Sequence, residues 1–300
     1  MICYRYHIIK AHHDCITINR TSRPRIPFRR NPLLSKGGVA SKPPHHIARS
    51  ASRKNSIARD WCGGKASWRV RSILVFYLDV MSITPMIISW YGQSCFKIQS
   101  GELVIAIDPF AKDIGLTPPR FRADIVLVTH AHKDHANVQA LAGTPFVVSG
   151  PGEYEIKDVH VHGIETFHDD REGALRGLNT VYVLSLEGIH IVHMGDFGEP
   201  ELRNATLEAI GNVDILILPV GSVYTIDARS AAKIVNQIEP AYAIPMHYRI
   251  PGLTVQLDTV DAFLKEIGSH DVKPQDRFAV KKKDIADGGE KTQIVLLEKL

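Results

Sequence analysis

An apolar run at residues 123–129 (ADIVLVT) is followed without a break by three imidazoles and a carboxylate. A short, continuous apolar run of this kind predicts a strand that is buried on both faces. Alternate residues of a chain leaving a strand share a side, so we expect His130 and His132 on one side of the turn. Asp134 and His135 then fall on the other side. Since imidazole nitrogen and carboxylate oxygen are ligands that Zn²⁺ accepts, this single loop can supply two metal positions.

The competing interpretation of the cluster is a solvated polar loop between a strand and a helix. A lone histidine would fit that interpretation well. The pattern His-x-His-x-Asp-His directly behind an apolar strand instead favours a metal site. With 44% hydrophobic and 23% charged residues, the composition is that of an ordinary globular protein, so the functional argument depends on the cluster.

The hydrophobic pattern after Met86 predicts one domain of alternating strands and helices. Further strands are predicted at residues 87–91, 94–98, 102–108, 144–148, 159–164, 181–186, 189–193, 213–219, 241–245 and 293–297, and helices at 136–142, 201–210, 227–238 and 259–267. Strands in both halves with helices between them are typical of two β-sheets covered by helices, an α/β layered arrangement. We therefore expect a single domain over residues 86–300.

The first 85 residues differ from the rest in charge. Residues 1–80 hold sixteen Lys or Arg and three acids, a net charge of +13, and because the whole chain is +4, residues 81–300 carry −9. Three interpretations of this basic extension are a disordered arm, a targeting sequence, and translated upstream DNA before a misplaced start codon. We favour the third, since Met81 and Met86 immediately precede the first patterned strand.

The cysteines and the apolar runs suggest a cytoplasmic location. Three of the four cysteines lie in the basic extension and only Cys95 lies beyond it, which leaves no disulfide framework in the domain and fits a reducing compartment. No uninterrupted apolar run reaches the length that a membrane-spanning helix needs. We therefore expect no membrane association.

The cluster, one position before it and three after it resemble the metallo-β-lactamase superfamily. His-x-His-x-Asp-His behind a buried strand is similar to that superfamily's signature, and the resemblance covers residues 86–300. Its other motif positions are filled in order, each after a strand-like run, by Asp108, His168, Asp196 and His247. The resemblance implies the four-layer αββα sandwich of the metallo-β-lactamase fold.

The resemblance also implies a ligand set and a mechanism. One metal would be held by His130, His132 and His168, a second by Asp134, His135 and His247, with Asp196 bridging the two and Asp108 supporting the ligands. Two such cations lower the pKa of a shared water, which attacks the substrate as a metal-bridging hydroxide. Asp134 and Asp196 are the expected catalytic carboxylates.

Ligand types within the motif favour two zinc ions. The diiron-flavin branch of the superfamily resembles this pattern but favours Glu at the position of His132. Mn²⁺ or iron remain alternatives. The β-lactamase subclass with a cysteine ligand would need Cys near position 196, where this chain has Asp196. Antibiotic hydrolysis is therefore not expected.

Three further sequence segments resemble one group of proteins within the superfamily. The sequences at 150–154 (GPGEY), 176–180 (RGLNT) and 245–248 (PMHY) are similar to those of uncharacterised bacterial and archaeal zinc-dependent hydrolases. Those proteins are similar to, but shorter than, ascorbate-6-phosphate lactonases. This similarity does not identify a substrate.

Four residues outside the ligand set have possible roles at the site. His193, which ends a strand before Gly195-Asp196, either donates to a metal-bound carboxylate or is a structural histidine. Arg176 and Asn179 lie on a glycine-flanked loop and either bind a substrate anion or anchor the loop. Tyr248, next to a predicted ligand, is expected to line the pocket.

The function predicted from these features is a dinuclear-metal hydrolase that cleaves a small ester, lactone or phosphorylated metabolite. A phosphodiesterase or nuclease of the same fold is one alternative, but the −9 charge of residues 81–300 argues against a polyanionic partner such as nucleic acid. A non-catalytic metal-binding sensor is another alternative, and iron-dependent thiol oxidation a third. The sequence predicts no oligomeric state.

Overall fold

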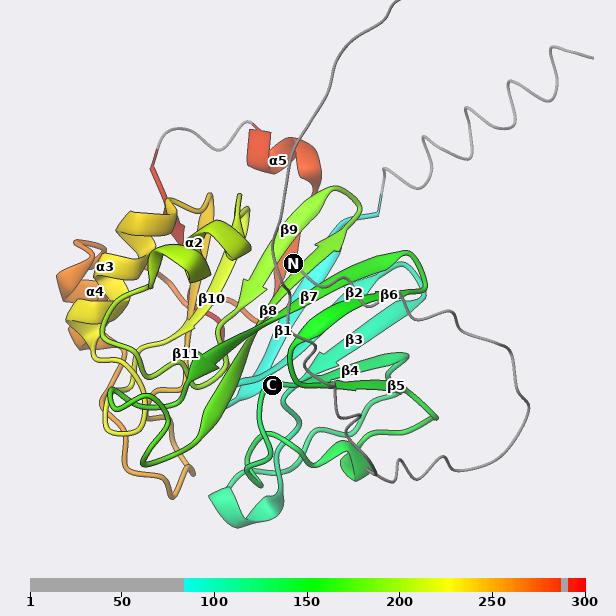
Figure 1. Cartoon of the computed structure of the whole chain (residues 1–300). Coiled ribbons are helices and arrows are strands. Elements are labelled where there is room, and N and C mark those ends of the chain that lie inside the picture. The colour runs from blue at the N-terminus through cyan, green and yellow to red at the C-terminus, as the bar shows by residue number, and fades with distance from the viewer. Residues whose placement is uncertain (1–83, 287–290) are drawn as a thin grey trace, which may run out of the picture. The chain divides into compact units, whose positions relative to one another are not determined.

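The computed structural model describes residues 84–286 and 291–300 (Figure 1). Apart from its last two positions, the basic extension predicted at 1–85 lies outside these residues, and its interpretation stays a prediction. Strands of the described residues form one six-stranded and one seven-stranded sheet, as expected for an α/β protein with two sheets. None of the helices described is both long and apolar enough to span a bilayer.

The first sheet has the strand order β12-β1-β2-β3-β4-β5. Its strands are β1 (Met86–Gly92), β2 (Cys95–Ser100), β3 (Leu103–Ile107), β4 (Ile125–Val128), β5 (Phe146–Ser149) and β12 (Phe278–Val280). The strands from β12 to β3 pair antiparallel, whereas β3, β4 and β5 run parallel. β4 is buried along its whole length, as its apolar sequence predicts. Because β3 and β4 are parallel, the residues that follow them emerge at one edge of the sheet.

The second sheet has the order β13-β11-β10-β9-β8-β7-β6. Its strands are β6 (Gly152–Ile156), β7 (Val159–Phe167), β8 (Leu178–Leu186), β9 (Ile189–His193), β10 (Ile215–Pro219), β11 (Tyr242–Met246) and β13 (Gln293–Ile294). The strands predicted at 181–186 and 189–193 are confirmed, and as β8 and β9 they pair antiparallel. The mostly polar β6 was not predicted as a strand, because its order comes from antiparallel pairing with β7.

The main hydrophobic core includes apolar side chains from strands of both sheets. Ile88, Phe96 and Ile105 of the first sheet belong to the same buried cluster as Tyr182 and Ile217 of the second. Each of these side chains is completely shielded from solvent. Burial of this apolar surface is the principal force that holds the sheets together.

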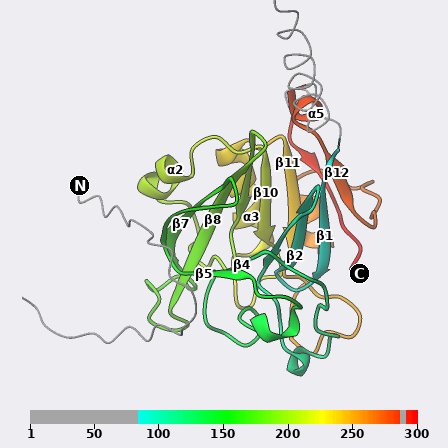
Figure 2. The ribbon, with the colours of Figure 1, turned by 90° about the vertical axis from the view of Figure 1, so that its right-hand side faces the viewer.

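Helices cover the second sheet (Figure 1 and Figure 2). α2 (Asn204–Ile210) packs against β7, α3 (Ala228–Ile238) packs against β10, and α4 (Asp261–Glu266) packs against α3. α3 is the amphipathic helix predicted at 227–238, and it begins at Asp227, whose carboxylate accepts the Ser230 N–H. A short α5 (Lys282–Ala286) follows β12.

The segment over the first sheet is less helical than predicted. Instead of a helix at 136–142, the chain has one turn of 3₁₀ helix, η2 (Val138–Ala140), in addition to η1 (Lys112–Ile114). The reason is that Asn137 bonds to the segment after β3: its N–H donates to Pro109 O and its Nδ2 to Phe110 O. These bonds replace the helical pairing that the pattern predicted.

Candidate metal centre

All seven predicted metal ligands follow the carboxyl end of a strand. The cluster from 130 to 135 follows β4, His168 follows β7, Asp196 lies three residues after β9, and His247 follows β11. Such ends are the usual place for binding sites in sheets that contain parallel strands. The structure brings the seven side chains together there in two groups.

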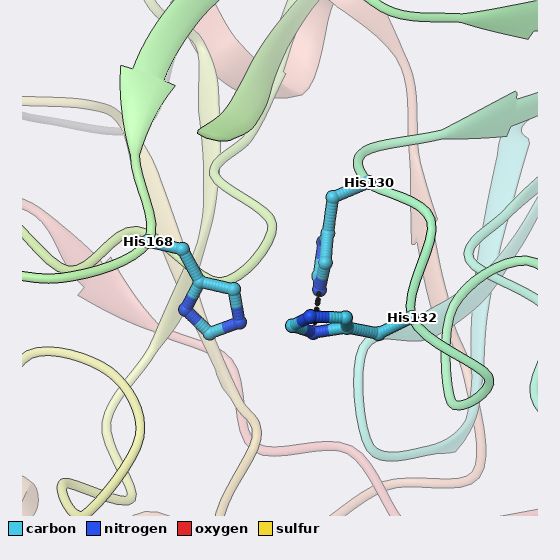
Figure 3. Close-up of side chains that lie close together, drawn as sticks. All are labelled: His130, His132 and His168. Atoms are coloured by element: carbon cyan, nitrogen blue, oxygen red, sulfur yellow. Dashed lines mark hydrogen bonds between the residues drawn. The ribbon is translucent and has the colours of Figure 1, made fainter. Parts of the chain in front are cut away.

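The first group consists of His130, His132 and His168, whose ligand atoms lie within 4.8 Å of one another. Figure 3 shows two rings arriving from one loop and the third facing them from the opposite side. His130 Nε2 and His132 Nδ1 are 3.0 Å apart. Two nitrogens on one tetrahedral zinc lie about 3.3 Å apart, given bonds of about 2.0–2.1 Å. The spacing of these nitrogens suits a shared metal.

The second group consists of Asp134, His135, Asp196 and His247. Asp196 Oδ2 lies 3.3 Å from the Nε2 atoms of both His135 and His247. The same oxygen lies 3.4 Å from Nε2 of His168, which belongs to the first group. Asp196 therefore stands between the two groups, the position that its predicted bridging role requires.

The chemistry of these residues fits a metal. His135 Nδ1 bonds to Asp108, while His135 Nε2 is buried without a hydrogen-bond partner among the described residues. This unpaired nitrogen faces the Asp134 and Asp196 carboxylates at 3.5 and 3.3 Å. An unpaired buried nitrogen is costly unless a bound ion satisfies it. Five imidazoles and two carboxylates are a donor set that Zn²⁺ accepts, and so the site fits the metal that the sequence predicted.

Burial keeps two ring nitrogens of the first group free of protons. Burial, together with repulsion from His135, lowers the pKa of His130 to about 2. Burial likewise lowers the pKa of His168, against the attraction of Asp196. Metals bind the neutral imidazole, so both rings are held in the form that coordinates.

The second group combines opposite charges in a buried space. Burial opposes charge on Asp196, but the neighbouring His135 and His247 outweigh it and hold the Asp196 pKa well below its ordinary value. Burial also opposes charge on His135, but Asp196 and Asp108 outweigh it and raise the His135 pKa well above its ordinary value. A cation entering this group would therefore displace the proton of His135.

The two groups open into a pocket of about 430 Å³. Its lining includes five of the seven predicted ligands together with Gln93, Asp113, Ile114, Lys133, Arg176, Tyr224 and Val255. Arg176 Nη2 donates to Val223 O at 3.2 Å, and its guanidinium lies 5.4 Å from the centroid of the Tyr224 ring. The pocket thus combines the polar cluster with apolar walls and two cationic side chains.

One buried carboxylate orders the loop that carries Arg176. Asp169 accepts hydrogen bonds from four backbone N–H groups at 2.7–3.0 Å, those of Arg171, Gly173, Leu175 and Arg176. These bonds outweigh burial and hold the Asp169 pKa below its ordinary value. Arg176 is therefore presented by a well-ordered loop.

A family model described as the beta-lactamase superfamily domain matches residues 87–247. The chain belongs to this superfamily. The match extends from β1 to His247 and therefore includes all seven predicted ligands.

Relatives that the chain matches carry the name UPF0173 metal-dependent hydrolase. One from Thermococcus kodakarensis is 30% identical over 191 residues, which cover 54% of this chain and 84% of the relative. One from Thermoplasma acidophilum is 31% identical over 190 residues, which cover 54% and 82%. This member of the superfamily is a metal-dependent hydrolase, as the sequence analysis predicted.

Solved structures agree with this family membership. A protein from Thermotoga maritima, assigned to the Zn-dependent hydrolases of the metallo-β-lactamase superfamily, matches with a TM-score of 0.57 and 31% identity over 71% of this chain and all of its own. An isothiocyanate hydrolase from Delia radicum gut bacteria matches at 0.51 with 14% identity over 71% and 97% of the chains, which shows the fold alone. The metallo-β-lactamase fold is confirmed, and the predicted similarity to ascorbate-6-phosphate lactonases stays a prediction.

Asp108 of the hydrolase lies where a support for the ligands is expected. Its Oδ1 accepts the Thr129 N–H at 2.8 Å, and its Oδ2 accepts Thr129 Oγ1 at 2.7 Å and His135 Nδ1 at 2.9 Å. Thr129 Oγ1 in turn lies 3.0 Å from His130 Nδ1. One carboxylate thus orients ligand rings of both groups.

His193 of the hydrolase supports the site through the backbone only. The prediction that it donates to a metal-bound carboxylate is wrong in this structure, because its ring lies between two backbone segments. Its Nε2 is 3.0 Å from Ser94 O, and its Nδ1 accepts the Gly195 N–H at 3.2 Å. The observed contacts fit the other role predicted for His193, that of a buried, hydrogen-bonded structural histidine.

Asn179 and Tyr248 of the hydrolase lie outside the pocket lining. This is contrary to the prediction for Tyr248, whereas for Asn179 it leaves the anchoring role, one of the two that the sequence predicted. Asn179 is buried, and its side chain bonds to Thr166 Oγ1, to Met194 O and to the N–H of Asp196. The Tyr248 ring is buried against Trp90, with centroids 5.0 Å apart. Both side chains point into the packed interior. The sequence did not reveal this direction, because it shows only that the two residues lie close to predicted site residues along the chain.

Two residues of the hydrolase that the sequence analysis did not single out contact the ligands. Gln93 Nε2 donates to Asp134 Oδ2 at 3.2 Å, and Ser94 Oγ donates to Asp196 Oδ1 at 3.2 Å. Both belong to the turn between β1 and β2. The available signal was a polar pair directly after the apolar strand that ends at Gly92, the same kind of position that the predicted ligands occupy.

Proposed function

We propose that this protein is a dinuclear hydrolase that binds two zinc ions and cleaves a small ester, lactone or phosphorylated metabolite. The observation that carries the proposal is the position of Asp196 Oδ2, within 3.4 Å of ring nitrogens from both groups. His130, His132 and His168 would hold one ion, Asp134, His135 and His247 the other, and Asp196 both. The named activity of the relatives supports the reaction class.

Two bound cations at such a site lower the pKa of a water held between them and polarise the bond that it attacks. The protein's own residues hold and orient the reacting groups. Asp196 and Asp134 keep their carboxylates ionised, since the pKa of each lies below its ordinary value. The buried rings of His130 and His168 and the walls of the pocket limit the access of bulk water.

The pocket supports a small, anionic substrate. Its volume of about 430 Å³ lies within the range of small-molecule sites. Lys133 and Arg176 line it and supply positive charge, while Ile114 and Val255 supply apolar surface. A negative charge of −9 on residues 81–300 disfavours nucleic acid as the substrate. A phosphorylated or carboxylated metabolite with a hydrolysable ester or lactone fits these features.

Metal analysis and a substrate panel test this proposal. We expect two equivalents of zinc in the purified protein and turnover of a lactone or phosphorylated ester rather than of bis-p-nitrophenyl phosphate. Asp134→Ala should abolish turnover with the fold retained, whereas Asp271→Ala, at an exposed position away from the pocket, should not change it. One equivalent of metal, or full activity in Asp134→Ala, would contradict the dinuclear mechanism. Bound metal without turnover of any class would favour the sensor alternative, and bound iron the oxidative one.

A further inference from the structure

The turn between β1 and β2 contacts three of the four residues in the second group. Besides the two side-chain bonds of Gln93 and Ser94, the backbone O of Gln93 accepts the N–H of His247 at 3.1 Å. Among the described residues, no hydrogen bond joins this turn to the three histidines of the first group. Gln93 therefore contacts only the second group, whereas Ser94 reaches both predicted metal positions through Asp196.

Ser94 binds the oxygen of Asp196 that does not face the imidazoles. Its hydroxyl donates to Oδ1, while Oδ2 faces the Nε2 atoms of His135 and His247 and that of His168 in the first group. Ser94 is completely buried, so no bulk water can replace this donor. Without it, the carboxylate would lose the contact that distinguishes its two oxygens.

Gln93 restrains Asp134. Its Nε2 donates to Asp134 Oδ2, the oxygen that lies 3.5 Å from His135 Nε2, and its side chain is completely buried although it lines the pocket. Asp134 is the most exposed carboxylate of the second group, with a quarter of its side chain accessible. A fixed donor is therefore most important at this ligand, which packing alone restrains least.

The turn itself is held in place from both sides. Gln93 adopts a left-handed backbone conformation with a φ of 52°, and its carbonyl also accepts the Trp90 indole N–H at 2.9 Å. The carbonyl of Ser94 faces Nε2 of the buried His193 at 3.0 Å. These contacts fix the donors of Gln93 and Ser94 relative to the second group. His193 therefore supports the site by holding this turn.

We infer that Gln93 and Ser94 are positioning residues for the proposed metal pair: Gln93 acts on the ion held by the second group alone, and Ser94 acts on both ions through the bridging Asp196. The inference rests on the proposed dinuclear function. Supports of this kind typically change metal affinity by about 10- to 100-fold. Removing the Gln93 donor should weaken binding at the second group by that factor and leave binding at the first group unchanged. Removing the Ser94 donor should weaken the binding of both ions.

The test is a zinc titration of chelator-stripped full-length protein, followed calorimetrically with a competing chelator. Ser94→Ala and Gln93→Met, singly and together, remove the donors while nearly preserving side-chain volume. Ser89→Ala, a buried serine on β1 of the same hairpin, is the matched control. Thermal unfolding of the metal-free proteins verifies that each variant folds, and the single variants suffice if the double variant does not.

The outcomes separate this inference from the function on which it rests. The expected result is two equivalents of zinc in every protein, with one of the two affinities reduced in Gln93→Met and both reduced in Ser94→Ala. If the folded variants bind both ions with the wild-type affinities, this inference is overturned while the dinuclear proposal stands. Equal weakening of both ions in Gln93→Met also overturns it. A single equivalent in the wild-type protein overturns both.

Discussion

Asp108 and His135, twenty-seven residues apart, are joined by a hydrogen bond of 2.9 Å between two completely buried side chains. The bond places the His135 proton on Nδ1 and leaves Nε2 directed at the carboxylates of the second group. A carboxylate behind a ligating histidine is the usual way in which proteins set the tautomer of the ring.

Asp108→Asn should therefore weaken metal binding without unfolding the protein. The amide would donate where the carboxylate accepts, so the proton of His135 would move to Nε2, the atom proposed to bind metal. We expect a loss of about 10- to 100-fold in zinc affinity, measured by chelator competition. Asp124→Asn, which removes a carboxylate bonded to Val104 N on the same sheet, is the control. If Asp108→Asn, Asp124→Asn and the wild-type protein bind zinc with the same affinity, this role of Asp108 is contradicted.

Asn179→Ala should reduce stability rather than substrate affinity. The substitution leaves the Asp196 N–H and Met194 O without their buried partner, which costs about 1–3 kcal/mol in the free energy of unfolding. KM should not change, because Asn179 lies outside the pocket lining. Denaturant unfolding and steady-state kinetics measure the two effects. A higher KM at unchanged stability would restore the substrate-binding role predicted from the sequence.

Arg176→Ala should lower kcat/KM for anionic substrates and leave kcat/KM for neutral substrates unchanged. Its guanidinium lines the pocket, and a hydrogen bond to a charged group contributes about 1.5–3 kcal/mol, which corresponds to roughly tenfold or more in kcat/KM. We expect this loss for a phosphorylated or carboxylated ester and none for a neutral analogue. Arg171→Ala, on the same loop but outside the pocket lining, is the matched control. Equal losses for both substrates would argue against an anion site.

Asp227→Ala should destabilise the protein in a pH-dependent manner. Asp227 Oδ1 accepts the Ser230 N–H at 2.8 Å, and this bond holds the Asp227 pKa below its ordinary value of 3.8. Loss of such a cap costs about 1 kcal/mol. Because the folded pKa is the lower one, the stabilisation is present above the unfolded pKa and disappears as the pH falls through the folded pKa.

Denaturant unfolding of wild type and Asp227→Ala from pH 7 to pH 3 should thus give a difference that shrinks only at the acidic end. Asp227→Asn keeps an acceptor at every pH and serves as the control, with stability close to that of wild type at pH 7. A difference that stays constant to the lowest pH would show that the charge of Asp227 plays no part.

The candidate ligands could be predicted from the sequence because the relevant information is local. A buried strand such as β4 has an apolar sequence, and polar side chains directly after it, such as His130 and Asp134, emerge at the edge where sites form. His168 and His247 also follow strands, so their order along the chain matched the superfamily's pattern. The helix predicted at 136–142 is wrong, because Asn137 bonds to residues that are distant in the sequence.

Sequence by itself determined which residue types follow which strands, and with them the superfamily and the candidate ligands, since both depend on short-range patterns. Only the tertiary structure decided the roles of the neighbours. Asn179 and Tyr248 point into the interior, whereas Gln93 and Ser94 reach the carboxylates from a different hairpin. The direction of a side chain in a turn depends on how the two sheets pack together, and contacts across about a hundred residues leave no periodic trace in the sequence.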